Sequence, residues 1–259
     1  MSVHAADSHA HDGGHAHHWE TSAAPLVISV GLLLLVPLGF SSYFVYENTQ
    51  LALLFSGLGA LTLIWGVAIW VREALTTTNM VEGAAGIGFP LFIVSEFFMF
   101  TALFVAYWVM RLFAESWPPA GTPVMETTKP LIMLALMVAS SVVLYLAGKK
   151  HEAGDLSGFR SGVLLTILMG VVFLGMTGAE YAHQIGIGFI PGSSVFSSAY
   201  YAITGFHAVH VLLGVGMFLF MYVFALSGKT NSTFVLCGSI FWYFLTIASV
   251  FVVSQVYFW

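Results

Sequence analysis

Long runs of residues without Asp, Glu, Lys or Arg constrain the fold of this chain more than any other feature of its sequence. Residues 181–228 and 230–259, for example, contain none of these four residue types. About 20 apolar residues are enough for a helix to cross the hydrocarbon core of a bilayer. A transmembrane β-barrel would show short alternating segments instead of these continuous runs. The sequence therefore predicts an all-α integral membrane protein.

The composition agrees with this class and excludes several functions. Charged residues make up 7% of the chain, whereas a soluble domain carries roughly 25%. No basic patch of the kind that binds nucleic acid is present, so no nucleic-acid partner is expected. The single cysteine, Cys237, excludes a disulfide within the chain and any copper site that needs two cysteines. The intramembrane histidines are too few for a haem-bearing redox core.

The charged residues divide the apolar sequence into seven predicted spans. These are 24–46, 51–71, 86–112, 129–148, 161–184, 197–226 and 233–257. Only residues 47–50 join the first two spans, so these two must form a tight antiparallel hairpin. The predicted organisation is a His-rich tail (1–22), a two-helix hairpin (23–72), a connecting loop (73–85) and a five-helix bundle (86–259).

The distribution of charge predicts how the chain lies in the membrane. The tail lacks the basic n-region of a signal peptide, and we expect it to be a disordered cytoplasmic segment, with Zn²⁺ or Cu²⁺ binding as the alternative. Lys and Arg accumulate on the cytoplasmic side of membrane proteins. Arg72, Lys149, Lys150, Arg160 and Lys229 lie on the side of the amino terminus, and Arg111 and Lys129 lie on the other. The amino terminus is therefore expected in the cytoplasm and the carboxyl terminus outside.

Ionisable groups inside the predicted spans are the candidate functional residues, because a charge at bilayer depth costs at least about 2.5 kcal/mol. Glu96 lies deep in the third span, and we expect its carboxyl to carry a proton unless a cation lies close by. Glu180 lies near the outer end of the fifth span, where we expect it to meet interfacial water. His207 and His210 share one face of the sixth span. They either ligate a metal or are two buried imidazoles, each hydrogen-bonded to a neighbour.

Four ordered segments of the chain resemble subunit III of the haem–copper cytochrome c oxidases. They are FIVSEFFMF (92–100), WPP (117–119), LGMTGAEY (174–181) and TGFHAVHVLLG (204–214). The resemblance implies a seven-helix accessory subunit in which the first two helices form a V-shaped cleft with the other five and hold phospholipid. It implies oxidase subunits I and II as partners that carry haem and copper, contact with cytochrome c through the complex, and a bacterial inner (cytoplasmic) membrane.

The resemblance also suggests roles for single residues inside the spans. Glu96 matches the carbodiimide-reactive carboxylate of the family, Glu180 begins its EY motif, and His207 and His210 match its paired histidines. These four residues are expected to form buried polar sites or to support proton uptake. None is expected to be catalytic, and no residue of the chain is expected to bind a metal.

Two further positions are compared with the family pattern. Trp70 and Arg72 match a family segment after the second helix and are expected to bind lipid. Tyr243 and Thr246 depart from the pattern, because the family usually has a histidine and an aspartate there. Any role of that polar pair is therefore absent or redistributed in this chain.

The expected function is that of a metal-free accessory subunit of an aerobic terminal oxidase, which reduces O₂ to water and pumps protons. The subunit would stabilise the catalytic subunit, bind lipids and support proton uptake. One alternative is subunit III of a quinol oxidase or of a nitric-oxide-reductase-type complex, since the chain does not fix the electron donor. Another is an independent proton channel or transporter that uses Glu96, Glu180 and the histidine pair as a relay.

Overall fold

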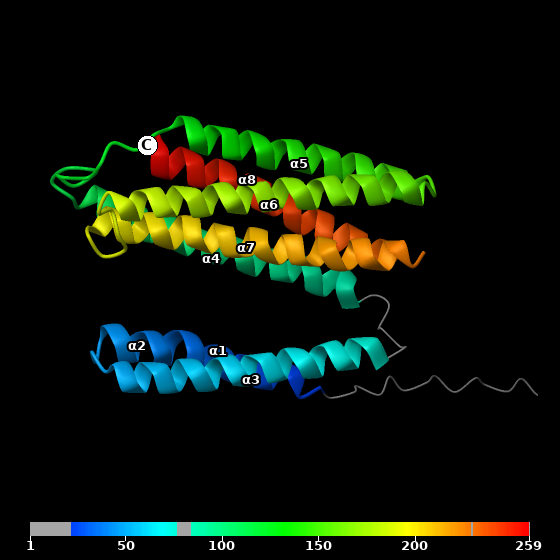
Figure 1. Ribbon diagram of the computed structural model, residues 1–259, viewed down its shortest axis with the longest axis horizontal. Helices are drawn as coiled ribbons and strands as arrows, with labels where there is room; N and C mark the ends of the chain where they lie inside the picture. The colour runs from blue at the N-terminus through cyan, green and yellow to red at the C-terminus, as the bar shows by residue number, and fades with distance from the viewer. Residues whose placement is uncertain (1–21, 77–83, 229, 259) are drawn as a thin grey trace, which may run out of the picture. The chain divides into compact units, whose positions relative to one another are not determined.

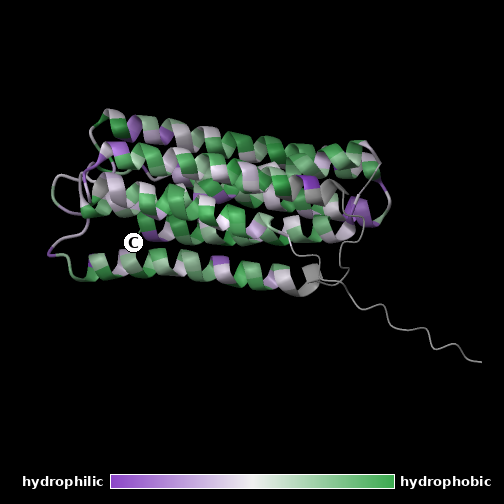
Figure 2. Cartoon of the chain, turned by 90° about the horizontal axis from the view of Figure 1, so that it is seen from below, coloured by the Kyte–Doolittle hydropathy of each residue, from purple (hydrophilic) through white to green (hydrophobic). Residues whose placement is uncertain are grey.

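The computed structural model of the chain describes residues 22–76, 84–228 and 230–258, and all regular structure within these ranges is helical. Seven helical segments in these ranges are long and apolar enough to cross a membrane, which confirms the predicted seven-span, all-α fold class. Figure 2 shows apolar residues along the lengths of the helices, with hydrophilic residues gathered mostly toward their ends. The chain is an integral membrane protein.

The chain divides into two compact units, residues 1–81 and 82–259. The first contains α1 (Ala24–Leu33), the π-helical turn η1 (Leu34–Leu38), α2 (Gly39–Phe44) and α3 (Thr49–Thr76). The second contains α4 (Ala84–Leu112), α5 (Thr128–Glu152), α6 (Leu156–Gly186), α7 (Val195–Leu226) and α8 (Ser232–Tyr257). The V-shaped cleft between hairpin and bundle stays a prediction, and the His-rich tail lies outside the described residues apart from Ser22.

The first arm of the hairpin is interrupted by a wider helical turn. A single span, Ala24–Tyr43, includes α1, η1 and α2, and Pro37 lies inside the π-helical turn. Proline lacks the N–H that a regular helix needs at this position, and its ring crowds the carbonyl of the preceding turn. A π turn accommodates both effects without ending the helix.

Close backbone contact joins the two arms of the hairpin, which lie against each other in Figure 1. A Cβ atom at Gly59 would lie 2.5 Å from the backbone nitrogen of Leu35 and 2.9 Å from the carbonyl oxygen of Gly31. A Cβ atom at Gly31 would lie 2.7 Å from the backbone nitrogen of Leu63. Only glycine fits at these two positions, since small residues let membrane helices approach closely.

Four helices of the second unit form a closed ring of neighbours. α5 lies against α6 and α8, α7 also lies against α6 and α8, and α4 packs on α7 and α8 (Figure 1). Trp242 of α8 fills the ring between Gly214 and Gly170, where added Cβ atoms would lie 2.8 and 3.0 Å from its indole ring. The indole nitrogen donates to Ser140 Oγ of α5 over 2.9 Å. The ring of helices therefore has a fully buried, hydrogen-bonded aromatic side chain at its centre.

Polar side chains at the starts of α6, α7 and α8 cap these helices. The Asp155 carboxylate accepts from the backbone N–H of Gly158 over 2.8 Å. Ser194 and Ser197 form a reciprocal capping box at the start of α7, and the Asn231 side chain caps α8. Each cap satisfies a backbone donor that has no partner within its own helix. These contacts fix where α6, α7 and α8 begin.

Candidate functional site

The carboxyl group of Glu96 is paired with His210. The two side chains come from α4 and α7, and Glu96 Oε2 lies 2.9 Å from His210 Nε2. The other ring nitrogen, Nδ1, lies 2.7 Å from the carbonyl oxygen of Phe206, one helical turn earlier on α7. The partner of the carboxyl group on the third span is therefore a histidine on the sixth span.

The contact with the carbonyl of Phe206 shows which nitrogen of the His210 ring carries a hydrogen. A carbonyl oxygen only accepts, so Nδ1 must carry a hydrogen that it donates to Phe206. Nε2 then either accepts a proton from a neutral Glu96 carboxyl or donates one to a Glu96 carboxylate. The rings of Phe100, Phe206 and Phe241 surround His210, with centroid distances of 5.4, 4.3 and 6.3 Å. Glu96 and His210 thus share one proton in an aromatic environment.

His207 has different surroundings, although it lies only three residues away on the same helix. Its side chain is 3% exposed, and neither ring nitrogen has a hydrogen-bond partner among the described residues. The rings of Phe173 and Phe100 approach its ring edge-on at 5.7 and 6.2 Å. Of the two imidazoles expected to be hydrogen-bonded, His210 has partners in the structure, and His207 has none among the described residues. An unsatisfied buried polar group costs about 1–3 kcal/mol, so a hydrogen-bond partner for the His207 ring would stabilise the fold.

The metal alternative for the histidine pair has no support in the described ranges. They contain no group of three His, Cys, Asp or Glu side chains placed to hold a metal ion. Both ring nitrogens of His210 are already engaged, with Glu96 and with the carbonyl of Phe206. A metal bridging His207 and His210 would have to break one of these contacts.

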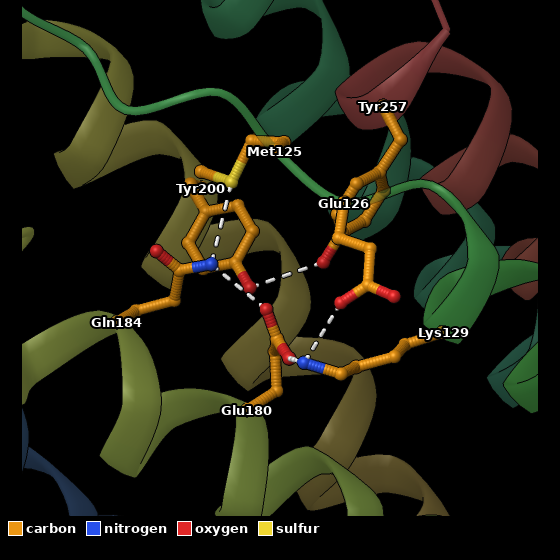
Figure 3. A network of polar contacts seen from close by, with 7 residues as sticks. All are labelled: Met125, Glu126, Lys129, Glu180, Gln184, Tyr200 and Tyr257. Atoms are coloured by element: carbon orange, nitrogen blue, oxygen red, sulfur yellow. Dashed lines mark hydrogen bonds and ion pairs between the residues drawn. The ribbon is translucent and has the colours of Figure 1, made fainter.

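Glu180 lies at the centre of a second polar cluster, shown in Figure 3. One carboxylate oxygen lies 3.2 Å from Lys129 Nζ, and the other accepts from Gln184 Nε2 over 2.8 Å. Lys129 also contacts Glu126, at 3.0 Å. Glu180 is 6% exposed, and contact of its carboxylate with interfacial water stays a prediction. The carboxylate is satisfied by a lysine on α5 and a glutamine on its own helix.

A cavity of about 50 Å³ lies within the ring formed by α5, α6, α7 and α8. Lys129 and Glu180 line it together with Tyr200, Thr204 and His207. The ammonium-bearing side chain of Lys129 is 42% exposed, whereas His207 is almost fully buried. The cavity therefore extends from the partly exposed Lys129 and its partner Glu180 to the imidazole of His207, which has no partner among the described residues.

Several polar contacts near this end of the bundle were not predicted from the sequence. The hydroxyl of Tyr257 donates to that of Tyr200 over 3.0 Å (Figure 3). Trp117 of the WPP segment donates to the Tyr107 hydroxyl over 3.1 Å, and Tyr107 donates to the backbone carbonyl of Gln255 over 2.8 Å. These contacts join the loop after α4 to the end of α8. No sequence signal distinguishes these tyrosines from the many aromatic residues of an apolar span.

The remaining predicted positions are Trp70, Arg72, Tyr243 and Thr246. Arg72 is exposed near the end of α3, the Trp70 side chain lies outside the described residues, and lipid binding by either residue stays a prediction. Thr246 donates to the carbonyl of Trp242 over 3.0 Å, and its oxygen lies 2.6 Å from Ser141 Oγ. A neutral hydroxyl pair between α5 and α8 thus occupies the position where the resemblance leads one to expect an aspartate.

Comparison with known proteins places the chain in a family. Residues 15–259 match the family described as cytochrome c oxidase subunit III. The cytochrome c oxidase subunit 3 of Thermostichus vulcanus is 32% identical over 66% of this chain and 85% of its own length. The proteins of the same name from Mycosarcoma maydis and Rattus norvegicus are each 28% identical, over 91% and 95% of this chain and 91% and 97% of their own lengths. The chain therefore belongs to the cytochrome c oxidase subunit III family.

Proposed function

We propose that this chain is a metal-free accessory subunit of an aerobic terminal oxidase, with cytochrome c as the electron donor of the complex. The family match over residues 15–259 carries the assignment to an oxidase, and the pairing of Glu96 with His210 across α4 and α7 supports an accessory role. The Glu96 carboxyl is held by His210 of a neighbouring helix, and aromatic rings surround that histidine. Such a group contributes to the structure and electrostatics of the subunit and not to bond-making chemistry.

The partners of the chain would be the catalytic subunits I and II, which would carry the haem and copper. In this assembly the chain stabilises the catalytic subunit, binds phospholipid and supports proton uptake. The broad apolar surfaces of its helices suit contact with lipid and with other membrane subunits. The Lys and Arg distribution supports an orientation with the amino terminus in the cytoplasm, and we propose the bacterial inner membrane as the location. Absorption spectra of the purified complex, with haem a present and oxidation of cytochrome c, would distinguish this oxidase from a quinol oxidase.

The test is the removal of the chain from the complex. An oxidase without it should reduce O₂ at a normal initial rate but lose activity sooner during continuous turnover. Glu96→Leu should shorten the turnover lifetime, and Glu96→Gln, which preserves a hydrogen bond to His210, should do so less. If the oxidase without the chain keeps its assembly, turnover lifetime and proton stoichiometry, the accessory role is wrong.

Proton flux through the purified chain alone in liposomes would contradict the proposal and support an independent proton channel. An independent channel would show a flux that Glu96→Gln abolishes. We expect no flux above that of protein-free liposomes.

A further inference from the structure

The cavity inside the ring of α5–α8 combines an unpartnered imidazole with a route to a charged pair. His207 lines the cavity with both ring nitrogens lacking a partner among the described residues. A neutral imidazole has one donor and one acceptor nitrogen, so two hydrogen bonds are needed to satisfy it. At the other end of the cavity, Lys129 and Glu180 are held 3.2 Å apart.

The cavity also contains hydroxyl groups along its length. Thr204 lies one turn before His207 on α7, and its hydroxyl donates to the carbonyl of Tyr200 over 2.6 Å. The Tyr181 hydroxyl lies 2.7 Å from the same Thr204 oxygen, so Tyr181 must be the donor. The Tyr200 hydroxyl accepts from Tyr257 over 3.0 Å, which leaves the hydrogen of Tyr200 available to another acceptor. Polar groups therefore occur between the mouth of the cavity and His207.

The volume of the cavity suits a few water molecules. A water molecule needs roughly 10–15 Å³ of such volume and two to four polar partners. The cavity offers about 50 Å³, which is enough for a short chain of waters and too little for a lipid tail. Buried waters of this kind occupy sites with otherwise unsatisfied polar groups, whereas a dry apolar cavity takes up xenon.

We infer that this cavity is a water-binding site, in which a chain of about three to five ordered waters (the cavity volume divided by roughly 10–15 Å³ for each water) bonds the His207 ring and extends toward Tyr200 and the Glu180–Lys129 pair. The two histidines of α7 then serve separate environments. His210 is paired with Glu96 on α4, and His207 is hydrated from the end of the ring where Lys129 is partly exposed. The inference depends only on the chain's own residues and not on the identity of the oxidase.

The test is a structure of the intact complex at a resolution that shows ordered water, with a second data set after xenon pressurisation. We expect a water within about 3 Å of a His207 ring nitrogen, with further waters toward Tyr200, and no xenon in the cavity. Xenon in the cavity, or a cavity with no ordered density beside His207, would overturn the inference.

Two substitutions at one position test the assignment to His207. His207→Leu should remove the water beside the ring, whereas His207→Gln, which has both a donor and an acceptor, should retain it. The matched control is His183→Leu on α6, where the side chain is exposed and does not line the cavity. The control should leave all cavity waters in place. The same water still present in His207→Leu would contradict the inference, and the wild-type and His207→Gln structures decide it if the leucine variant fails to fold.

Discussion

The hairpin of α1–α3 and the bundle of α4–α8 use different means of holding membrane helices together. The arms of the hairpin meet through backbone atoms at Gly31 and Gly59. The helices of the bundle meet through buried side chains, among them Trp242 and the pairs Glu96–His210 and Glu180–Lys129. Lipid is as apolar as leucine, so hydrophobicity alone does not join helices within a membrane. Close approach and polar pairing are two independent ways to join helices: the hairpin arms meet by the first, and the bundle adds the second.

The largest difference between the units should come from removing a tryptophan in each. Trp242→Ala should lower the free energy of unfolding by about 3–5 kcal/mol, because it leaves a cavity at the centre of the ring. Trp65→Ala in the hairpin should cost less than about 1 kcal/mol, since surface substitutions away from special contacts have small effects. Trp242 is 0% exposed and Trp65 is 62% exposed. Equilibrium unfolding in mixed micelles measures both, and equal losses would show that the two units are not packed differently.

A methyl group added between the arms should break the hairpin without affecting the bundle. Gly59→Ala should cost about 2 kcal/mol, because its Cβ meets backbone atoms of the other arm that cannot move aside easily. Gly57→Ala is the matched control on the same helix, since a Cβ there has no neighbour within 4 Å. Cysteine cross-linking between the arms should fall in the first variant and stay unchanged in the second. Unchanged cross-linking in Gly59→Ala would argue against backbone contact as the basis of the hairpin.

A smaller loss is expected when the link between α4 and α7 is removed. Glu96→Leu should cost about 1 kcal/mol, because it leaves His210 Nε2 buried without a partner. Glu96→Gln should cost less, since its amide can still bond the ring. The thermal unfolding midpoint of the complex would rank the variants. A leucine variant as stable as the glutamine variant would show that the hydrogen bond contributes nothing to the packing of α4.

The smallest expected effect depends on pH and involves the start of α6. The backbone N–H of Gly158, and secondarily Lys150, lowers the pKa of Asp155 from its ordinary value of 3.8. A carboxylate with a lowered folded-state pKa stabilises the fold fully above its unfolded-state pKa, and this contribution is lost as the pH falls through the folded-state pKa. Asp155→Ala should therefore lower the unfolding midpoint slightly at pH 7, and the difference should disappear as the pH falls below about 4. A difference that persists at pH 2 would exclude the charge as its source.

The sequence predicted the number and type of the helices well, but several predicted spans are too short at one or both ends. A charged residue does not always mark a loop: Arg160 lies inside α6 and donates to the carbonyl of Ala225 near the end of α7 over 2.9 Å. Lys149 and Lys150 likewise lie in the last turn of α5, where cations interact favourably with the helix dipole. A long basic side chain can remain in a helix by reaching a polar group at its end.

The residues of the site were predicted from the sequence, but their partners were not. Glu96 and the two histidines were identified because ionisable residues are rare in apolar runs. Their partners were not, because spans that are apolar on all faces give no periodic signal for the face that turns inward. The pairing of Glu180 with Lys129 was not predicted, although Lys129 begins the predicted span 129–148. Which charge meets which depends on the rotation of each helix, and that is set only when the whole bundle packs.

The single proton shared by Glu96 and His210 has a consequence for the electrical behaviour of the membrane. Whether the proton lies on the carboxyl or on the ring, the sum of charges on the two groups is zero. A shift between the two forms moves the proton by less than the 2.9 Å that separates the heavy atoms, which is a small fraction of a bilayer core of about 30 Å. The pair can therefore change its dipole in response to a nearby charge while carrying almost no gating charge across the membrane field.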